Sequence, residues 1–395
     1  MISVRLVRRS AVLTFVLLVS VLVAPVSAAG QVAPGVTYRP FELATEHGAV
    51  TGYVLTVDLR TARLDLLHPG RVAARDEVPD MADAARALGG VNGDFFNISE
   101  THEGVEPTGS SVGPAIAGGQ DLKAAVPDGQ RFGPALPAGT SARDVFGVGA
   151  DRRARVASLD LAGAVRGGGE EFDIEGLNQY ALPVGGIGVF DRHWGPMARV
   201  RATCGTDASR SAPCSAETEE VVVRRGVVVA ERDTPGAGAI PEDTVVLVGR
   251  EAGADELEAL DPGDRVVVRH RLVAAALPPF RFAVGGFPIL RGGTPLPGLD
   301  TRALAPRTAA GASADGRTAY LVVVDGRSTS SAGMSVAGLA GLLRSFGAAD
   351  AVNLDGGGSS TLVLREPGQD RVTVRNTPSD GRPRAVANGI GVFAR

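Results

Sequence analysis

The sequence predicts an α+β fold built around a mixed β-sheet, with a β-rich subdomain inserted into it. Two short apolar runs, residues 320–324 and 351–354, flank a segment whose apolar residues recur at helical spacing, which is typical of strand, helix, strand. Valine-rich runs repeat between residues 217 and 272 and are typical of strands. We therefore expect one main domain over residues 30–395, with the β-rich insertion at 217–272.

The strand-helix-strand unit also predicts the side of the sheet at which a ligand binds. Tyr320–Val324 ends in Asp325, and Ala351–Leu354 ends in Asp355, with an amphipathic helix over Val336–Phe346 between them. A crossover that contains one helix makes the two strands parallel. Asp325 and Asp355 should then emerge at the same carboxyl edge of one sheet, where ligands bind in such sheets.

The N-terminal part predicts further elements. Tyr53–Leu59 and Arg63–Leu67 alternate between apolar and polar residues, as expected for paired strands joined by a short turn. A helix is expected between Pro79 and the glycines at 89–90. The Gly/Pro-rich stretch from Ser99 to about Thr140 is either a wrapping active-site loop or plain connection.

Composition and charge exclude several classes of protein. The chain has 395 residues, of which 44% are hydrophobic and 21% charged, as in a globular protein. Lys123 is the only lysine, and its surroundings match no Schiff-base, Walker or S-x-x-K motif. Without the three arginines of the leader, 37 basic residues face 44 acidic ones, a formal charge of −7. Nucleic acid is therefore not an expected partner.

Residues 1–29 are expected to be a signal peptide. Three arginines precede an apolar run over Ala11–Val23, and small residues follow up to Ala28. The run is shorter than the roughly 20 residues that span a bilayer. We expect cleavage near Ala28, secretion, and no membrane span in the mature chain. The pair Arg8-Arg9 leaves the twin-arginine export route open beside ordinary secretion.

Cys204 and Cys214 are the only cysteines. In an exported chain, a pair ten positions apart predicts a local disulfide that pins a surface loop. A metal site with two thiolates is the alternative.

Two segments carry candidate chemistry. Asp355 is followed by three glycines and Ser359-Ser360-Thr361, whose amides and hydroxyls could hold an anion such as phosphate; a tight turn is the alternative. Asp94 lies between Gly93 and two phenylalanines and is either a general base or nucleophile, or a turn-capping residue. Arg307 and Arg327 are candidate phosphate ligands.

Two hydrolase motifs are excluded by their context. Gly109–Gly113 matches G-x-S-x-G, but no apolar strand leads into it and Pro114 follows, so a serine hydrolase is not expected. His102-Glu103 has no second histidine at the spacing of a zinc helix.

Taken in chain order, the motifs resemble the phosphodiester glycosidase family. The resemblance extends from about residue 36 to residue 392, and its glycine-rich motif is highly specific. Its motifs are Val91-Asn92-Gly93-Asp94-Phe95-Phe96, Gly285-Gly286-Phe287-Pro288, Arg307-Thr308-Ala309, Val324-Asp325-Gly326-Arg327 and Asn353-Leu354-Asp355-Gly356-Gly357-Gly358-Ser359-Ser360-Thr361.

The resemblance implies a secreted hydrolase that cleaves a sugar-1-phosphodiester at the anomeric C–O bond and leaves a phosphomonoester. It implies a phosphoglycan or cell-envelope glycoconjugate as substrate and no cofactor that the sequence shows, with a divalent metal left open. Asp355 and Asp94 are the expected catalytic carboxylates. The expected substrate and phosphate ligands are Asn92, Gly93, Arg307, Asp325, Arg327, Asn353, Gly356, Gly357, Gly358, Ser359 and Ser360. A phosphodiesterase that cuts the P–O bond and a non-catalytic envelope or exopolysaccharide-binding protein are the alternatives.

Overall fold

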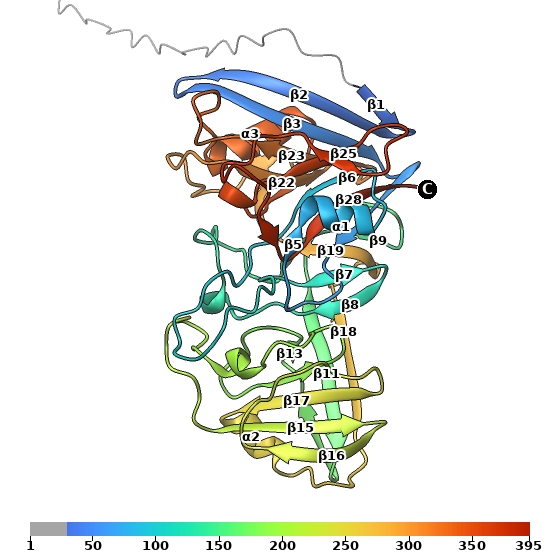
Figure 1. Ribbon diagram of the computed structural model, residues 1–395, viewed down its shortest axis with the longest axis vertical. Coiled ribbons are helices and arrows are strands. Elements are labelled where there is room, and N and C mark those ends of the chain that lie inside the picture. The colour runs from blue at the N-terminus through green and yellow to red at the C-terminus, as the bar shows by residue number, and fades with distance from the viewer. Residues whose placement is uncertain (1–29) are drawn as a thin grey trace, which may run out of the picture.

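A computed structural model describes residues 30–395, and the expected signal peptide lies outside the described residues. The molecule is longer than it is wide, and most of its ordered elements are β-strands (Figure 1). It therefore contains much less helix than an α+β fold implies.

The largest sheet has eight strands and forms the upper part of the molecule in Figure 1. In spatial order its strands are β1 (Gly30–Ala33), β2 (Val36–Thr45), β3 (Gly48–Asp58), β23 (Thr318–Val324), β22 (Arg307–Ala312), β24 (Asp350–Asn353), β20 (Phe287–Arg291) and β21 (Thr294–Pro295). Helix α3 (Val336–Ser345) packs on β20, β22 and β24, and the Ser335 hydroxyl caps its first turn by accepting from Gly338 N at 3.1 Å. The predicted helix of the strand-helix-strand unit is confirmed.

The prediction that Asp325 and Asp355 leave the sheet at the same side is confirmed. The prediction that the central sheet is mixed is wrong. Strand β22 lies between β23 and β24 and pairs antiparallel with both, so these two strands run in the same direction without touching. Asp325 and Asp355 therefore leave the sheet at one edge, and Arg307, at the start of β22 opposite Val324, lies at that same edge. Every neighbouring pair in this sheet is antiparallel. Among residues 30–395 the one parallel pair, β13 (Gly176–Leu177) with β14 (Ile187–Phe190), belongs to another sheet.

Two five-stranded sheets pack beside the central one. The first contains β26 (Val372–Val374), β25 (Leu362–Arg365), β6 (Gly89–Asn92), β28 (Gly389–Ala394) and β4 (Ala62–Leu67); the second contains β10 (Ala154–Ser158), β9 (Asp144–Gly149), β19 (Phe280–Gly285), β7 (Ala115–Ala117) and β8 (Gln120–Lys123). The expected pairing of residues 53–59 with 63–67 is wrong, because β3 and β4 enter different sheets and β4 pairs with β28. Alternation marks a strand but does not name its neighbour. Helix α1 (Val78–Ala84) and the short pair β5 (Asp76–Glu77) and β27 (Ala385–Val386) complete this part.

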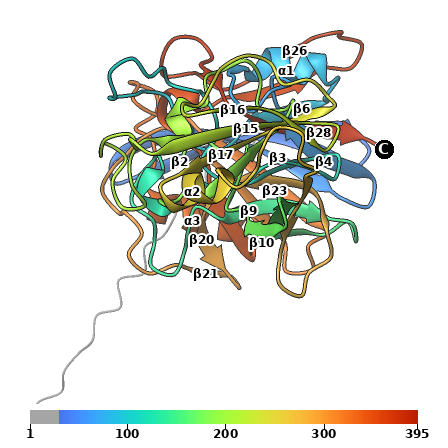
Figure 2. The same cartoon turned by 90° about the horizontal axis from the view of Figure 1, so that it is seen from below.

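The lower part of the molecule contains the valine-rich strands. One sheet has β13, β14, β17 (Thr244–Arg250), β15 (Thr218–Arg224) and β16 (Val227–Arg232), with α2 (Ala252–Leu257) against it; a second has β12 (Glu170–Asp173), β11 (Asp160–Gly167) and β18 (Val267–Val273). The strands of residues 217–272 thus share their sheets with strands from residues 160–190. Figure 2 shows β15, β16 and β17 lying across the lower end.

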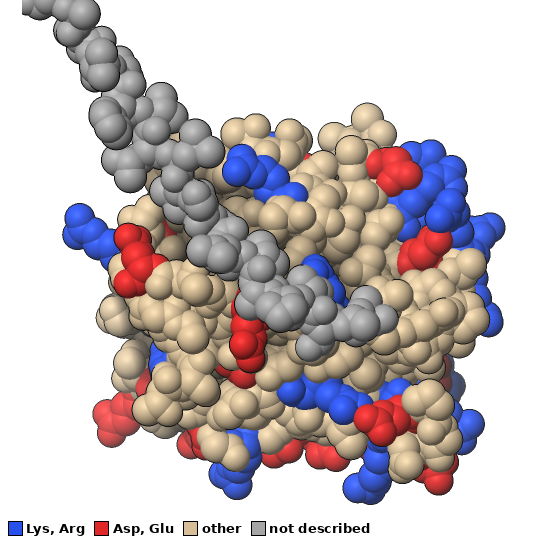
Figure 3. All heavy atoms as spheres, turned by 90° about the horizontal axis from the view of Figure 1, so that it is seen from above, with Lys and Arg blue, Asp and Glu red and all other residues tan. Residues whose placement is uncertain are grey.

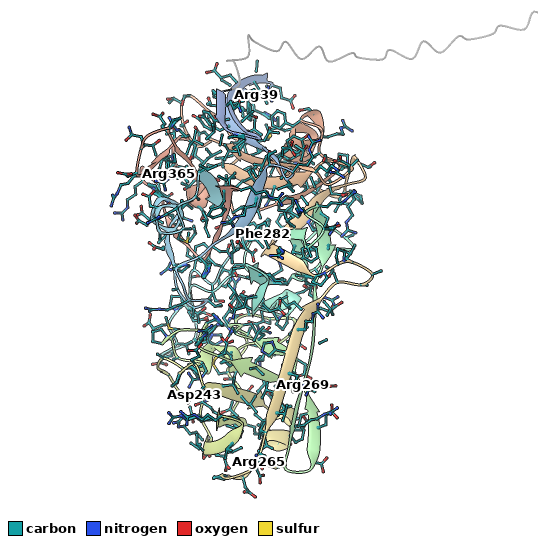
Figure 4. The ribbon with its side chains drawn as sticks, turned by 90° about the vertical axis from the view of Figure 1, so that its right-hand side faces the viewer. Arg39, Asp243, Arg265, Arg269, Phe282 and Arg365 are labelled. Atoms are coloured by element: carbon teal, nitrogen blue, oxygen red, sulfur yellow. A yellow bond between two sulfur atoms is a disulfide. The ribbon has the colours of Figure 1, made fainter. Side chains whose placement is uncertain are left out.

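Among residues 30–395, buried apolar side chains form three clusters, and the first of them reaches into the lower part, where it includes Val246 and Val248 on β17. One core joins the central sheet to its neighbours and includes Phe282 on β19, which lies near the middle of the molecule in Figure 4. A second core lies between the lower sheets and includes Leu247 and Leu257. Among residues 30–395, no helix is both long and apolar enough to cross a membrane. In Figure 3 the upper face shows acidic and basic side chains scattered over a largely uncharged surface.

The predicted disulfide is confirmed: Cys204 and Cys214 are bonded to each other. With their sulfur atoms joined, the alternative site with two free thiolates does not form.

We expect the double variant Cys204→Ala/Cys214→Ala to lose about 3 kcal/mol of unfolding free energy, because the bridge restricts the unfolded chain. Chemical denaturation of the oxidised parent and the variant measures this loss. Two thiols that react with a thiol reagent in the unfolded, unreduced parent would contradict the bridge.

Candidate functional site

The glycine-rich loop after β24 folds onto the start of β22. Gly356 N donates to its neighbour's carboxylate, Asp355 Oδ1, at 2.9 Å, and Gly357 N donates to Pro306 O at 2.9 Å. A Cβ at Gly356 would lie 2.8 Å from Pro306 O, and Gly357 has a φ of +60°. The first two glycines are therefore required by close approach and by a left-handed backbone.

A second loop, after β6, is joined to the glycine-rich loop through Asn92. Its Nδ2 donates to Asp355 O at 2.7 Å, and its Oδ1 accepts from Thr308 Oγ1 at 2.7 Å and from Thr361 N at 3.1 Å. Asp355 N in turn donates to Gly93 O at 2.9 Å. These bonds bring the segments of Asp94 and Asp355, which are 261 residues apart in the sequence, together at one place.

Asp94 is almost completely buried, in a pocket made by small residues. Its Oδ2 accepts from Gly113 N at 2.6 Å, and a Cβ at Gly285 would overlap that same oxygen. Lys123 lies behind it and donates to the carbonyls of Val112, Gly113 and Ala124. Gly113 thus connects the lysine to the carboxylate through its carbonyl and its amide.

Burial governs the charge of these groups. It raises the pKa of the Asp94 carboxyl, against the opposing effects of the Gly113 amide and Lys123, and it lowers the pKa of the Lys123 ammonium. Burial also raises the pKa of Asp355 to about 6, against hydrogen bonds from Ser359 and Gly356. The charge of Asp94 adds to this rise. Shifted carboxylates that act on each other are typical of catalytic sites.

The two carboxylates differ in what they can reach. Asp355 is partly exposed, whereas Asp94 is 3% exposed. A cavity of about 10 Å³ beside Asp94 is lined by Arg131, Asp144 and Phe287 among others, and this volume suits about one water molecule. Asp355 is therefore the carboxylate placed to meet a larger molecule.

Three arginines surround the glycine-rich loop. A Cβ at Gly357 would lie 3.2 Å from Arg327 Nη1, and a Cβ at Gly356 would lie 3.8 Å from Arg307 Cδ. Arg384 Nη1 donates to Ser359 Oγ at 3.5 Å, while its Nη2 pairs with Asp380 at 2.6 Å. Positive charge is thus gathered next to Asp355.

Arg307, like Arg384, uses most of its donors within the protein. Its Nε donates to Met334 O at 2.8 Å and its Nη2 to Ala303 O at 2.6 Å. Burial, with the nearby charge of Arg327, lowers the pKa of this guanidinium from its ordinary value. Arg384 is paired with Asp380 through two of its nitrogens, whereas the exposed side chain of Arg327 has no hydrogen bond or ion pair among the described residues, so Arg327 is the freest of the three to contact a ligand.

Several predicted ligands have internal partners instead. Asp325 Oδ1 accepts from Thr377 N at 3.0 Å and from Asn376 Nδ2 at 3.3 Å, and burial raises the pKa of its carboxyl. Asn353 Nδ2 donates to Leu354 O, and Ser360 Oγ accepts from Thr308. These side chains hold the loops, as Asn92 does, although each lies at the same sheet edge as Asp355.

The predicted residues thus fall into two sets: those that gather around Asp355, and those whose side chains hold the loops. The loop Gly356 to Ser359, the segment Gly93 to Asp94, and Arg307, Arg327 and Asp355 come together at one edge of the central sheet. The sequence patterns do not predict that Arg384, Lys123 and Arg131 lie at this site. Arg384 stands four residues after its partner Asp380, but this spacing is too common to mark a site.

Metal-ligand side chains cluster elsewhere. In the part of the chain that the structure describes, one group of such side chains has its donor atoms close together: His102, Cys204 and Cys214. The two sulfurs are bonded to each other.

Two solved structures share this fold, and a third matches with a lower score. A hypothetical protein from Synechocystis is 21% identical with a TM-score of 0.71; the match covers 94% of this chain and 64% of that one, so this chain spans less than two thirds of its length. A putative exported protein from Burkholderia pseudomallei is 26% identical with a TM-score of 0.66, over 87% of this chain and 74% of that one. The catalytic domain of zebrafish N-acetylglucosamine-1-phosphodiester alpha-N-acetylglucosaminidase, auto-inhibited by its pro-peptide, matches at 17% identity and a TM-score of 0.47, over 94% and 87% of the two chains. A search of curated proteins finds no match.

The fold and the site define a β-rich protein that carries two buried carboxylates with raised pKa values and a group of arginines at one end of its central sheet. The phosphodiester glycosidase family matches residues 217–393, which confirms the resemblance over this part of the chain. The matched residues include Asp355, its glycine-rich loop and all three arginines, whereas Asp94 lies before them.

The raised pKa of Asp355 predicts a pH-dependent stability difference. A carboxyl whose pKa is about 6 in the folded chain and about 4 in the unfolded chain costs stability as the pH rises between these values. We expect Asp355→Asn to gain about 2 kcal/mol of unfolding free energy relative to the parent between about pH 4 and pH 7. Urea denaturation of both proteins at several pH values measures it. A difference that stays constant over this range would mean that Asp355 titrates normally.

Proposed function

We propose that the chain is a secreted glycosidase that hydrolyses a sugar-1-phosphodiester at the anomeric C–O bond, releasing the sugar and leaving a phosphomonoester. The observation that carries this proposal is the position of Asp355 beside a glycine-rich loop and three arginines. A carboxylate and an anion-holding surface are the two things that this reaction needs.

Asp355 supplies the carboxylate in this proposal, either by attacking the anomeric carbon or by activating water. With a pKa of about 6 it is ionised at neutral pH, yet it is less well solvated than a surface carboxylate. Asp94 is buried beside it, and its charge raises the pKa of Asp355 further.

The arginines serve the leaving group. A departing phosphomonoester carries two negative charges once its second proton, with a pKa of about 6, has been lost. Arg327 lies against Gly357 and can hold that charge without delivering a proton, and Arg384, which bonds to Ser359 and pairs with Asp380, lies at the same loop.

Export and a glycoconjugate substrate complete the proposal. The disulfide and the leader-like first 29 residues support secretion, as does the similarity to a protein described as exported. The family match supports a phosphodiester-linked sugar in a phosphoglycan or envelope polymer.

Hydrolysis of a sugar-1-phosphodiester in oxygen-labelled water tests the reaction directly. Label in the released sugar supports cleavage of the C–O bond, and label in the phosphate would instead indicate a phosphodiesterase. No turnover of any such substrate would favour the alternative of a non-catalytic binding protein.

We expect Asp355→Asn to lower kcat by roughly 10²-fold or more, because the variant loses the reacting charge and little volume. Asp350→Asn is the matched control. Asp350 begins the same strand at the opposite edge and accepts one backbone bond, from Gly292 N at 3.0 Å. Steady-state kinetics on a nitrophenyl phosphodiester of a sugar measure both variants, and equal losses would contradict the assigned role.

We expect Arg327→Gln and Arg384→Gln to lower kcat/KM for the phosphodiester about tenfold more than for an activated aryl glycoside of the same sugar, since each removes a charged contact to phosphate. Arg344→Gln, on the exposed face of α3, is the control and should leave both substrates unaffected. Equal losses on both substrates would mean that the two arginines support structure or bind the sugar. Arg307 is less informative, because its removal also breaks its structural hydrogen bonds to Met334 O and Ala303 O.

A further inference from the structure

A second basic hollow lies away from the carboxylate site. It has a volume of about 740 Å³ and is formed by the turn after β3, strand β4, the β7–β8 turn, the end of β9, β19 and the end of β28. Four arginines line it: Arg63, Arg152, Arg281 and Arg395. The only acidic side chain in its lining is Asp65.

The hollow and the carboxylate site lie at opposite ends of the strands of the central sheet. Asp325 N bonds to Thr51 O at one end of β3, whereas Leu59, which lines the hollow, follows the other end of that strand. Eight residues of extended chain span roughly 25 Å. A ligand of monosaccharide size cannot touch both places at once.

The charge of the hollow is neutralised from within only at Arg63. Asp65 is already used: its Oδ2 pairs with Arg63 at 3.2 Å, and its Oδ1 accepts from the amides of Leu66 and Gly118. Among the described residues, the exposed side chains of Arg152 and Arg281 have neither an ion pair nor a hydrogen bond within the protein.

Neighbouring acids do not neutralise it either. Asp151 pairs with Arg155, and Asp58 pairs with Arg60, neither of which lines the hollow. A basic hollow is therefore kept on a chain whose formal charge is −4 overall. Such a local excess attracts anions, and most strongly anions with repeated charge.

The floor of the hollow is suited to sugar rings between the charges. Leu59, Ala62, Leu64 and Val148 are buried apolar residues in its lining. The Arg63 guanidinium is held in place over the Phe393 ring, 4.2 Å from its centroid. An apolar floor and several cations, of which Arg63 is held in place, together match a polymer in which sugar or polyol units alternate with phosphate.

We infer that this hollow, lined by Arg63, Arg152 and Arg281, is an accessory site that binds a phosphate-bearing stretch of a glycan polymer remote from the bond being cleaved. The polymer class rests on the proposed function, and the binding site itself rests on the hollow. Such a site keeps the enzyme on its polymer and does nothing for a small substrate.

Binding is tested with the full mature chain carrying Asp355→Asn, so that the polymer is not consumed. The probe is poly(glycerol phosphate), with inorganic phosphate and neutral dextran as comparisons, and calorimetry at low and high salt is the measurement. The test variant is Arg152→Asn/Arg281→Gln; asparagine suits the positive φ of residue 152. The matched control is Arg265→Gln/Arg269→Gln, which removes two exposed charges at the lower end of the molecule (Figure 4).

We expect the test variant to bind the polymer about tenfold more weakly at low salt, with a smaller salt dependence, and the control to bind normally. Equal weakening by both variants would overturn the inference, as would dextran binding as tightly as the polymer. Inorganic phosphate that binds as tightly as the polymer would show a small-anion site and overturn the glycan assignment.

Kinetics separate this inference from the proposed function. On the Asp355 parent, the test variant should raise KM for the polymer several-fold and leave kcat/KM for a nitrophenyl phosphodiester sugar unchanged. An equal loss on both substrates would overturn the accessory site. Polymer binding that depends on Arg152 and Arg281 in a chain that turns over neither substrate would refute the proposed function and leave the hollow supported.

Discussion

The buried amide of Asn92 is the contact on which the rest of the site depends. Its side chain bonds to Asp355 O, to Thr308 Oγ1 and to Thr361 N, so it joins strand β6 to the central sheet and to both ends of the glycine-rich loop. An amide has a donor and an acceptor at one end of a short side chain, which a carboxylate or a hydroxyl cannot match here. Because Asn92 is fully buried, each of these bonds must form for the fold to be stable.

The position of Asn92 allows two carboxylates to be held close together, with Asp94 away from water and Asp355 partly exposed. Burial makes their charged forms costly, and the structure offsets this only in part, through Gly113 N at Asp94 and through Gly356 N and Ser359 at Asp355. Glycine is needed at 113 and 285 because a Cβ at either position would press on Asp94 Oδ2. The raised pKa of both carboxyls is the direct result of this packing.

The places where positive charge gathers on this molecule follow from its local packing and not from its overall composition. The chain is acidic overall, yet arginines gather around the glycine-rich loop and again around the hollow at the opposite sheet edge. Nearly all of its cations are arginine, whose planar fork suits phosphate. The single lysine is instead buried behind Asp94, where it donates to three backbone carbonyls.

The sequence by itself determined the local features: the helix over residues 336–345, the common direction of β23 and β24, the disulfide, and the glycine-rich loop after Asp355. These follow from periodicity, from glycine chemistry and from short spacings, which act within a few tens of residues. Only the tertiary structure decided that β22 separates the two strands, that β3 and β4 enter different sheets, and that Arg384 and Lys123 lie beside the carboxylates. It also decided that Asp325 and Asn353 hold the protein together rather than face the loop. The reason is physical: a hydrogen-bond partner or a neighbouring strand is chosen by packing among segments hundreds of residues apart, and no local pattern encodes that choice.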